Sequence, residues 1–205
     1  MKKLLFAIVA LCAMLSSVDA GAQLVADAGF YSIHENENKN HTNKLRGVYL
    51  GAKYYYSLDH ILTNLSLVPG VNVSIASGSN SMIYYGSKQT ELALNIPVMA
   101  NYTYRVNEMI KVFAQAGPTV QFGISNKASY SGSGSKTSYN CYQDNAITPP
   151  RRRLDIFLGF GAGVEVYDQY QLLIGYDLGL LQLSSNTDYM HLTRDLFHIG
   201  LGYRF

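Results

Sequence analysis

The chain has 205 residues, of which 48% are hydrophobic and 15% are charged, and its formal net charge at pH 7 is +2. This length fits one domain, and a charge so close to zero indicates no nucleic-acid partner. Only two cysteines occur, which excludes a fold held together by many disulfides.

The N-terminus has the features of an export signal. Two lysines precede an apolar run at 4–15, and the small residues Ala20, Gly21 and Ala22 follow it. This order is typical of a secretory signal peptide with cleavage after Ala22. The run is too short for a transmembrane helix, which needs about 20 apolar residues. We therefore predict a signal peptide at residues 1–22 and a mature domain at residues 23–205.

Eight stretches of the mature chain alternate large apolar residues with polar residues or glycine. Strict alternation predicts β-strands that have one apolar face and one polar face. No stretch shows a helical period of comparable strength. In chain order, the eight predicted strands are 24–30, 48–58, 65–75, 92–104, 112–124, 156–166, 170–180 and 197–205.

The connections between these strands alternate in length. Those after the second, fourth and sixth strands are short, at 59–64, 105–108 and 168–169. The others are longer and more polar, at 34–43, 77–89, 126–152 and 184–195. Outer-membrane barrels have short periplasmic turns and long extracellular loops. The lengths therefore predict a bacterial outer-membrane barrel with both termini in the periplasm.

The polar face of the strands indicates which side points inward. Eight strands leave an interior just wide enough for side chains, where acids and bases can pair. The apolar face would then form a continuous band against lipid, and closure leaves no unpaired strand edge. We thus predict an all-β, eight-stranded, antiparallel, up-and-down transmembrane β-barrel. The residues predicted to point inward are Asp27, Lys53, Asn72, Asn95, Gln115, Gln121, Glu165, Asp177 and Arg204.

Aromatic residues recur where the predicted strands reach the periplasmic side. Tyrosine favours a membrane boundary because its ring is apolar and its hydroxyl group binds water. We expect one aromatic belt at this height, formed by Tyr54, Tyr56, Tyr102, Tyr104, Tyr170, Tyr203 and Phe205.

Two stretches carry a family resemblance. LALNIPVMANYTY at 92–104, followed by FAQAGPTVQFGI, resembles the PorT-like outer-membrane β-barrel family of Bacteroidetes. The resemblance covers the whole mature chain and implies a fold and a location more firmly than an activity. The last strand resembles the signal that the barrel-assembly machinery reads in Gram-negative bacteria. Its apolar residues are Phe197, Ile199, Leu201, Tyr203 and Phe205.

Three groups of residues are candidates for chemistry. The stretch HENENKNH at 34–41 lacks the spacing of a metal-binding helix, so we interpret it as a solvated outer loop. His198 is expected to point inward and to meet Glu165 or Asp177 in a structural hydrogen bond, because no serine arrangement accompanies it. We predict no catalytic, metal or cofactor site.

The third group is a run of arginines at the outer end of the sixth predicted strand. Arg151, Arg152 and Arg153 either bind lipopolysaccharide phosphates, which suit the forked guanidinium group, or are solvated charges at the membrane boundary. After signal cleavage Cys141 is the remaining cysteine, and it is either free or paired between molecules.

These patterns favour a non-enzymatic surface or envelope protein with a side-chain-filled interior and extracellular recognition loops. Its expected partners are outer-membrane lipid, lipopolysaccharide and the barrel-assembly machinery, and the sequence names no partner for the loops. The alternatives are a narrow channel or transporter for small solutes, an accessory component of protein secretion, and a barrel enzyme that acts on lipid.

Overall fold

The computed structural model describes residues 23–37, 41–82, 85–132, 135–143, 150–184 and 192–205. The predicted signal peptide, residues 1–22, lies outside the described residues. Among the described residues, no helix has the length and hydropathy needed to cross a membrane.

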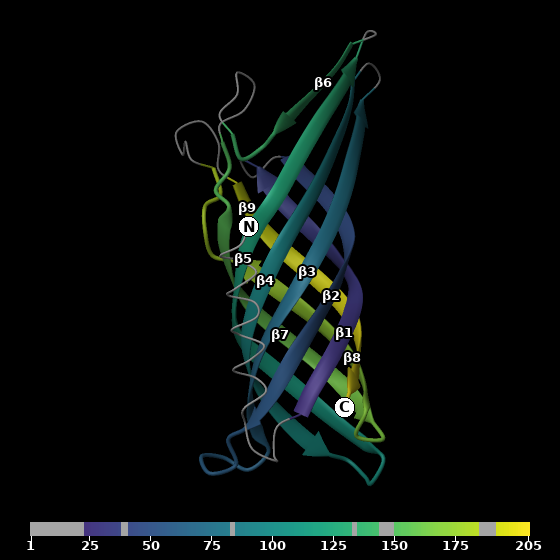
Figure 1. The fold of residues 1–205 in the computed structure, drawn as a ribbon, viewed down its shortest axis with the longest axis vertical. Coiled ribbons are helices and arrows are strands. Elements are labelled where there is room, and N and C mark those ends of the chain that lie inside the picture. The colour runs from purple at the N-terminus through teal and green to yellow at the C-terminus, as the bar shows by residue number, and fades with distance from the viewer. Residues whose placement is uncertain (1–22, 38–40, 83–84, 133–134, 144–149, 185–191) are drawn as a thin grey trace.

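The described residues form nine antiparallel strands, which make up a closed barrel and a short hairpin extension of it (Figure 1). The strands are β1 (Gln23–Glu37), β2 (His41–Ser57), β3 (Leu65–Met82), β4 (Tyr85–Arg105), β5 (Ile110–Gly132), β6 (Ser135–Asn140), β7 (Leu154–Val166), β8 (Tyr170–Gly179) and β9 (Leu192–Arg204).

Eight of these strands form the barrel wall. Each predicted strand lies inside one of them, except that the last residue of three predicted strands falls just outside. Neighbours in the chain pair in order from β1 to β5, then β5 pairs with β7, and β7 to β9 follow. Pairing of β1 with β9 closes the ring, and at this seam Phe205 N donates to Leu24 O over 3.0 Å. The short β6 pairs with the far end of β5 alone. The predicted fold class is therefore confirmed.

The two faces of the wall differ as predicted. Outward side chains such as Phe30, Leu50 and Leu201 are exposed, and the inward Asp27, Gln121, Glu165 and Asp177 are buried. The strand period places alternate residues on opposite faces, so one apolar band surrounds the whole barrel.

Small residues let large inward side chains lie flat against the wall. An added Cβ at Gly200 would overlap the hydroxyl group of Tyr49, and one at Gly175 would overlap the His198 ring. Two buried apolar clusters complete this part of the interior, one around Phe157 and Leu45 and one around Val68.

The aromatic belt is present at the end of the barrel that carries the short turns, which we call the short-turn end. Tyr170 and Tyr203 meet edge to face with ring centroids 5.5 Å apart, and Phe205 lies 5.0 Å from Tyr203. Tyr56, Tyr102 and Tyr104 are also exposed there. Tyr54 differs from the expectation, because only 8% of it is exposed.

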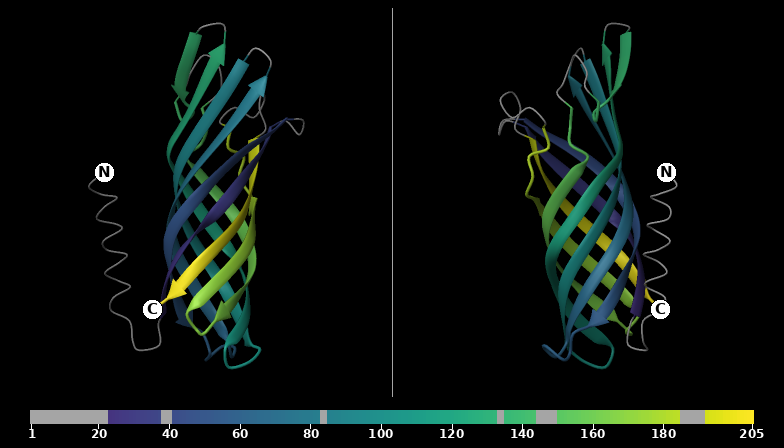
Figure 2. Two further views of the ribbon diagram at one scale, coloured as in Figure 1. Left: turned by 90° about the vertical axis from the view of Figure 1, so that its right-hand side faces the viewer. Right: turned by 60° about the vertical axis from the view of Figure 1, so that its left-hand side comes forward.

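The predicted long loops are wrong in one respect: much of their length is strand. Residues 77–82 and 85–89 extend β3 and β4, and residues 126–132 and 135–140 form the upper part of β5 and all of β6. These strands rise beyond the rest of the barrel at the opposite end, which we call the hairpin end (Figure 2). Both faces of these extensions carry polar residues. Their sequences therefore lack the apolar–polar alternation that predicts a strand, although the backbone pairing continues.

Candidate functional site

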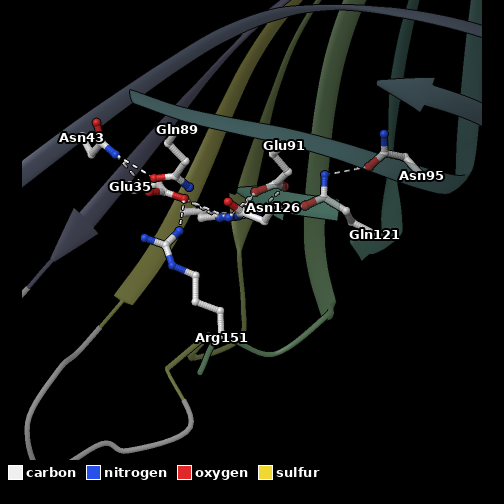
Figure 3. Close-up of polar contacts among 9 residues, drawn as sticks. Glu35, Asn43, Gln89, Glu91, Asn95, Gln121, Asn126 and Arg151 are labelled. Carbon is white, nitrogen blue, oxygen red and sulfur yellow. Dashed lines mark hydrogen bonds and ion pairs between the residues drawn. The ribbon is translucent and has the colours of Figure 1, made fainter. Parts of the chain in front are cut away.

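Two carboxylates and two arginines form a buried cluster inside the hairpin end of the barrel (Figure 3). Arg194 of β9 lies between Glu35 of β1 and Glu91 of β4, with its Nη2 atom 2.8 Å from Glu35 Oε1 and 2.7 Å from Glu91 Oε2. Arg151 Nη1 lies 2.8 Å from the same Glu35 oxygen. The four charges cancel, and we call this group the Arg194 cluster.

Amide side chains complete the hydrogen bonding of the Arg194 cluster. Asn126 donates to Glu91 Oε2 over 2.6 Å, and Arg194 Nη1 donates to Gln121 over 3.2 Å. Gln121 in turn donates to Asn95 over 2.7 Å, which extends the network towards the middle of the barrel. Both glutamate side chains are 1% exposed. Buried charges at this level of burial persist only when they are paired and hydrogen-bonded.

A second set of ion pairs lies near the middle of the barrel. Lys53 Nζ is 2.9 Å from Asp27 Oδ2, and His198 Nδ1 is 3.5 Å from Asp177 Oδ2. These residues and Tyr49 line a cavity of about 70 Å³. The Oδ1 atoms of both aspartates lack a hydrogen-bond partner among the described protein groups. A cavity of this size that is lined by charged and amide side chains beside apolar ones has room for water molecules that satisfy such oxygens.

A third set closes the interior at the short-turn end. Glu165 Oε2 lies 2.6 Å from Arg204 Nη2 and accepts a 2.7 Å hydrogen bond from Gln171. Lys111 Nζ lies 3.3 Å from the other oxygen of Glu165. The Arg204 guanidinium also lies 4.4 Å from the ring centroid of Tyr55. Three charged layers therefore cross the barrel from one end to the other.

The prediction that stretch 34–41 is a solvated loop is wrong for its ends, because residues 34–37 belong to β1 and His41 begins β2. Glu35 points into the Arg194 cluster because the alternation that turns Asp27 inward continues to it along β1. The part of the chain that the structure describes contains no group of three or more His, Cys, Asp or Glu side chains placed to hold a metal ion. His198 lies beside Asp177, one of its two predicted partners, while Glu165 contacts Arg204 and Lys111.

The three consecutive arginines separate in the structure. Arg151 turns inward to Glu35 and is 15% exposed. Arg153 donates to the carbonyl oxygens of Gly123 and Ile124, each over 3.1 Å, and its guanidinium lies 4.6 Å from the ring centroid of Tyr142. Arg152 is exposed. Contact with lipopolysaccharide stays a prediction, and the pairing of Arg151 leaves Arg152 and Arg153 to make it.

The five residues of the predicted assembly signal all point outward, four of them on β9 and Phe205 directly after it. Phe197 is 42% exposed and Phe205 is 74% exposed, and Ile199, Leu201 and Tyr203 lie between them on the same face. Recognition of this face by the assembly machinery stays a prediction.

Two members of the Arg194 cluster were missed from the sequence, although a signal for them was present. Arg194 continues the inward series of Arg204 and His198 towards the start of β9, and Glu35 continues that of β1. Both residues fell in segments that were interpreted as loops. Extending the two-residue period past the apolar band would have found them.

Cys141 gives a direct test of how tightly the hairpin end is packed. Its side chain is free and 4% exposed, and burial raises the pKa of the thiol. A raised pKa lowers the thiolate fraction at neutral pH, and the thiolate is the reactive form. We expect a maleimide to label the folded protein slowly and the urea-unfolded protein rapidly, measured by mass spectrometry.

The matched control moves the thiol to an exposed position of β6. The variant C141S/S138C should be labelled at the same rate in the folded and unfolded states, since Ser138 is exposed. Equal rates for Cys141 in the two states would contradict its burial.

The chain matches one family model and is similar to several solved structures. A family model described as outer membrane protein beta-barrel domain matches residues 4–205. Two similar solved structures are Ail, the attachment invasion locus protein of Yersinia pestis (18% identity, 91% of this chain and 100% of that chain, TM-score 0.45), and neisserial surface protein A (16% identity, 91% and 100%, TM-score 0.48). The outer membrane enzyme PagL is also similar (13% identity, 85% and 97%, TM-score 0.43). No curated protein matches the sequence.

Proposed function

The chain belongs to the outer membrane protein beta-barrel domain family, and from that premise we propose that it is a non-enzymatic barrel that holds its long hairpins at the cell surface. The hairpin end faces outward and both termini lie in the periplasm. The barrel acts as a rigid anchor, and the hairpins supply the surface for recognition.

The Arg194 cluster is the observation that carries this proposal. A transporter needs a continuous water path, but here charge pairs cross the interior at three heights and an eight-stranded barrel leaves little other space. A buried network whose charges are all paired also favours one rigid arrangement of the strands that contribute to it. These features support an anchor in preference to a conduit.

The proposal that the protein is not an enzyme rests on how the interior side chains are paired. His198 contacts Asp177, and the nearby hydroxyl group of Ser74 accepts a 3.0 Å hydrogen bond from Asn95. Nucleophilic catalysis needs a hydroxyl or thiol within hydrogen-bond reach of a base. Around this cavity the histidine pairs with an aspartate and the serine hydroxyl pairs with an asparagine, which is not the nucleophile–base arrangement.

Cysteine labelling on intact cells tests the proposed orientation. In a C141S background, S138C lies at the hairpin end and E108C lies in a short turn, and both positions are exposed. We expect a membrane-impermeant maleimide to label S138C on intact cells, and E108C only after the outer membrane is opened. The opposite pattern would place the hairpins in the periplasm.

Planar-bilayer recording tests the main alternative, a channel for small solutes. We expect the pure protein to show no stable conductance steps of porin size, because the interior pairs block the path. Arg194→Ala is the variant in which conductance would be easiest to detect, since it removes the guanidinium that joins Glu35 to Glu91. Reproducible large steps from the unmodified protein would favour the channel. A role in protein secretion rests on the PorT-like resemblance alone.

A further inference from the structure

We propose that the outer face of β2 to β5, just above the apolar band at the hairpin end, binds the phosphorylated head group of a lipid in the outer leaflet. Four exposed cationic residues form this surface, which we call the basic belt: Lys44, Arg46, Lys88 and Lys127.

Strand register places the basic belt on the lipid-facing side of the wall. Arg46 pairs with Ser77, Ser77 with Thr90, and Thr90 with Lys127, so these four residues form one row across β2, β3, β4 and β5. Residues directly opposite in an antiparallel sheet share a face. Lys44 and Lys88 stand two residues further from the band on their strands and therefore on the same face.

The height of the basic belt matches that of lipid head groups. The outward residues next below it are Val48, Ile75 and Leu92, which pair with one another across β2, β3 and β4 as the edge of the apolar band. A cation two residues above that edge meets the headgroup region, about 7 Å away along the strand. A lipid whose chains lie on the band would thus bring its phosphate to these side chains.

The charge of the basic belt is not neutralised by the protein. Among the described residues, none of the four cations forms an ion pair. Glu91 of β4 and Glu35 of the neighbouring β1 both point inward to the Arg194 cluster. The charge of the outward residues changes at the seam between β1 and β9. There the outward Asp195 of β9 lies opposite His34 of β1 in the strand register. The basic surface is therefore confined to one side of the wall.

Hydroxyl groups between the cations suit a phosphate ligand. Ser77 Oγ and Thr90 Oγ1 lie 3.3 Å apart, between Arg46 and Lys127 in the same row. Phosphate oxygens accept charge-assisted hydrogen bonds from guanidinium and ammonium groups and further hydrogen bonds from hydroxyls. Strands lie about 4.8 Å apart, so one bulky glycolipid head group can contact several of them.

Binding of the detergent-solubilised full-length protein to bisphosphorylated lipid A, and to the same lipid without phosphates, tests this inference. The unmodified protein should prefer the phosphorylated lipid, and K44Q/R46Q/K88Q/K127Q should lose at least about tenfold in affinity, which corresponds to about 1.4 kcal/mol. A variant with arginine at the three lysine positions should keep the affinity. Heat-modifiable migration checks that each variant is folded.

A control separates this surface from the other predicted lipopolysaccharide contact. R152Q/R153Q should lose less affinity for the phosphorylated lipid than the quadruple variant does. Loss of binding in that control alone, or equal affinity for the two lipids, would overturn the inference. The inference rests on the proposed orientation only for the choice of leaflet, and binding in detergent does not depend on orientation. Labelling that reverses the topology would therefore leave this result intact.

Discussion

Replacing Arg194 with methionine is expected to lower the free energy of unfolding by about 3–5 kcal/mol, the usual cost of removing one partner from a buried ion pair. Methionine fills much of the space but leaves the carboxylate of Glu91 without its guanidinium partner, while Glu35 keeps Arg151. Urea unfolding in liposomes, followed by heat-modifiable migration, measures this loss.

Two further variants show whether the effect arises from uncompensated charge. R194M/E91Q should be more stable than R194M, because neutralising Glu91 removes the charge that the loss of Arg194 leaves without a partner. Arg152→Met changes an exposed arginine at the same end and should stay within about 0.5 kcal/mol of the unmodified protein. A loss below about 1 kcal/mol for R194M would mean that the Arg194 cluster does not hold the strands together.

Deleting Phe205 is expected to remove most of the protein from the outer membrane of living cells, while the purified variant still folds into liposomes. The Phe205 ring is 74% exposed and contacts Tyr203, so its loss should cost no more than about 1.5–3 kcal/mol of apolar contact. A closed barrel tolerates a loss of that size. The larger effect in cells would come from recognition of the last strand by the assembly machinery.

The two measurements for this deletion have separate meanings. Surface abundance close to that of the unmodified protein would show that Phe205 is not part of an assembly signal. Failure to fold in liposomes would show that Phe205 is needed for closure at the seam, where its backbone N–H donates to Leu24. Phe30→Ala is a suitable control, because Phe30 is an equally outward phenylalanine at 68% exposure but lies on β1.

Local pattern was sufficient for the barrel wall. A stretch such as 92–104 must show one face to lipid and the other to paired polar groups, so its alternation directly records which side each residue occupies. The same logic correctly turned Asp27, Glu165 and Arg204 inward, and the alternating connection lengths gave the antiparallel order. These features depend on residues that are close together in the chain, so the sequence alone is sufficient to predict them.

The Arg194 cluster was decided by the tertiary structure. Glu35 and Arg194 are 159 residues apart and meet because closure places β9 beside β1, and Glu91 joins them from across the barrel. Pairing between strands also decided that the polar segments of β3 to β6 continue as sheet. Above the lipid band both faces of these strands carry polar residues, so alternation disappears while the backbone hydrogen bonds that define the strands remain.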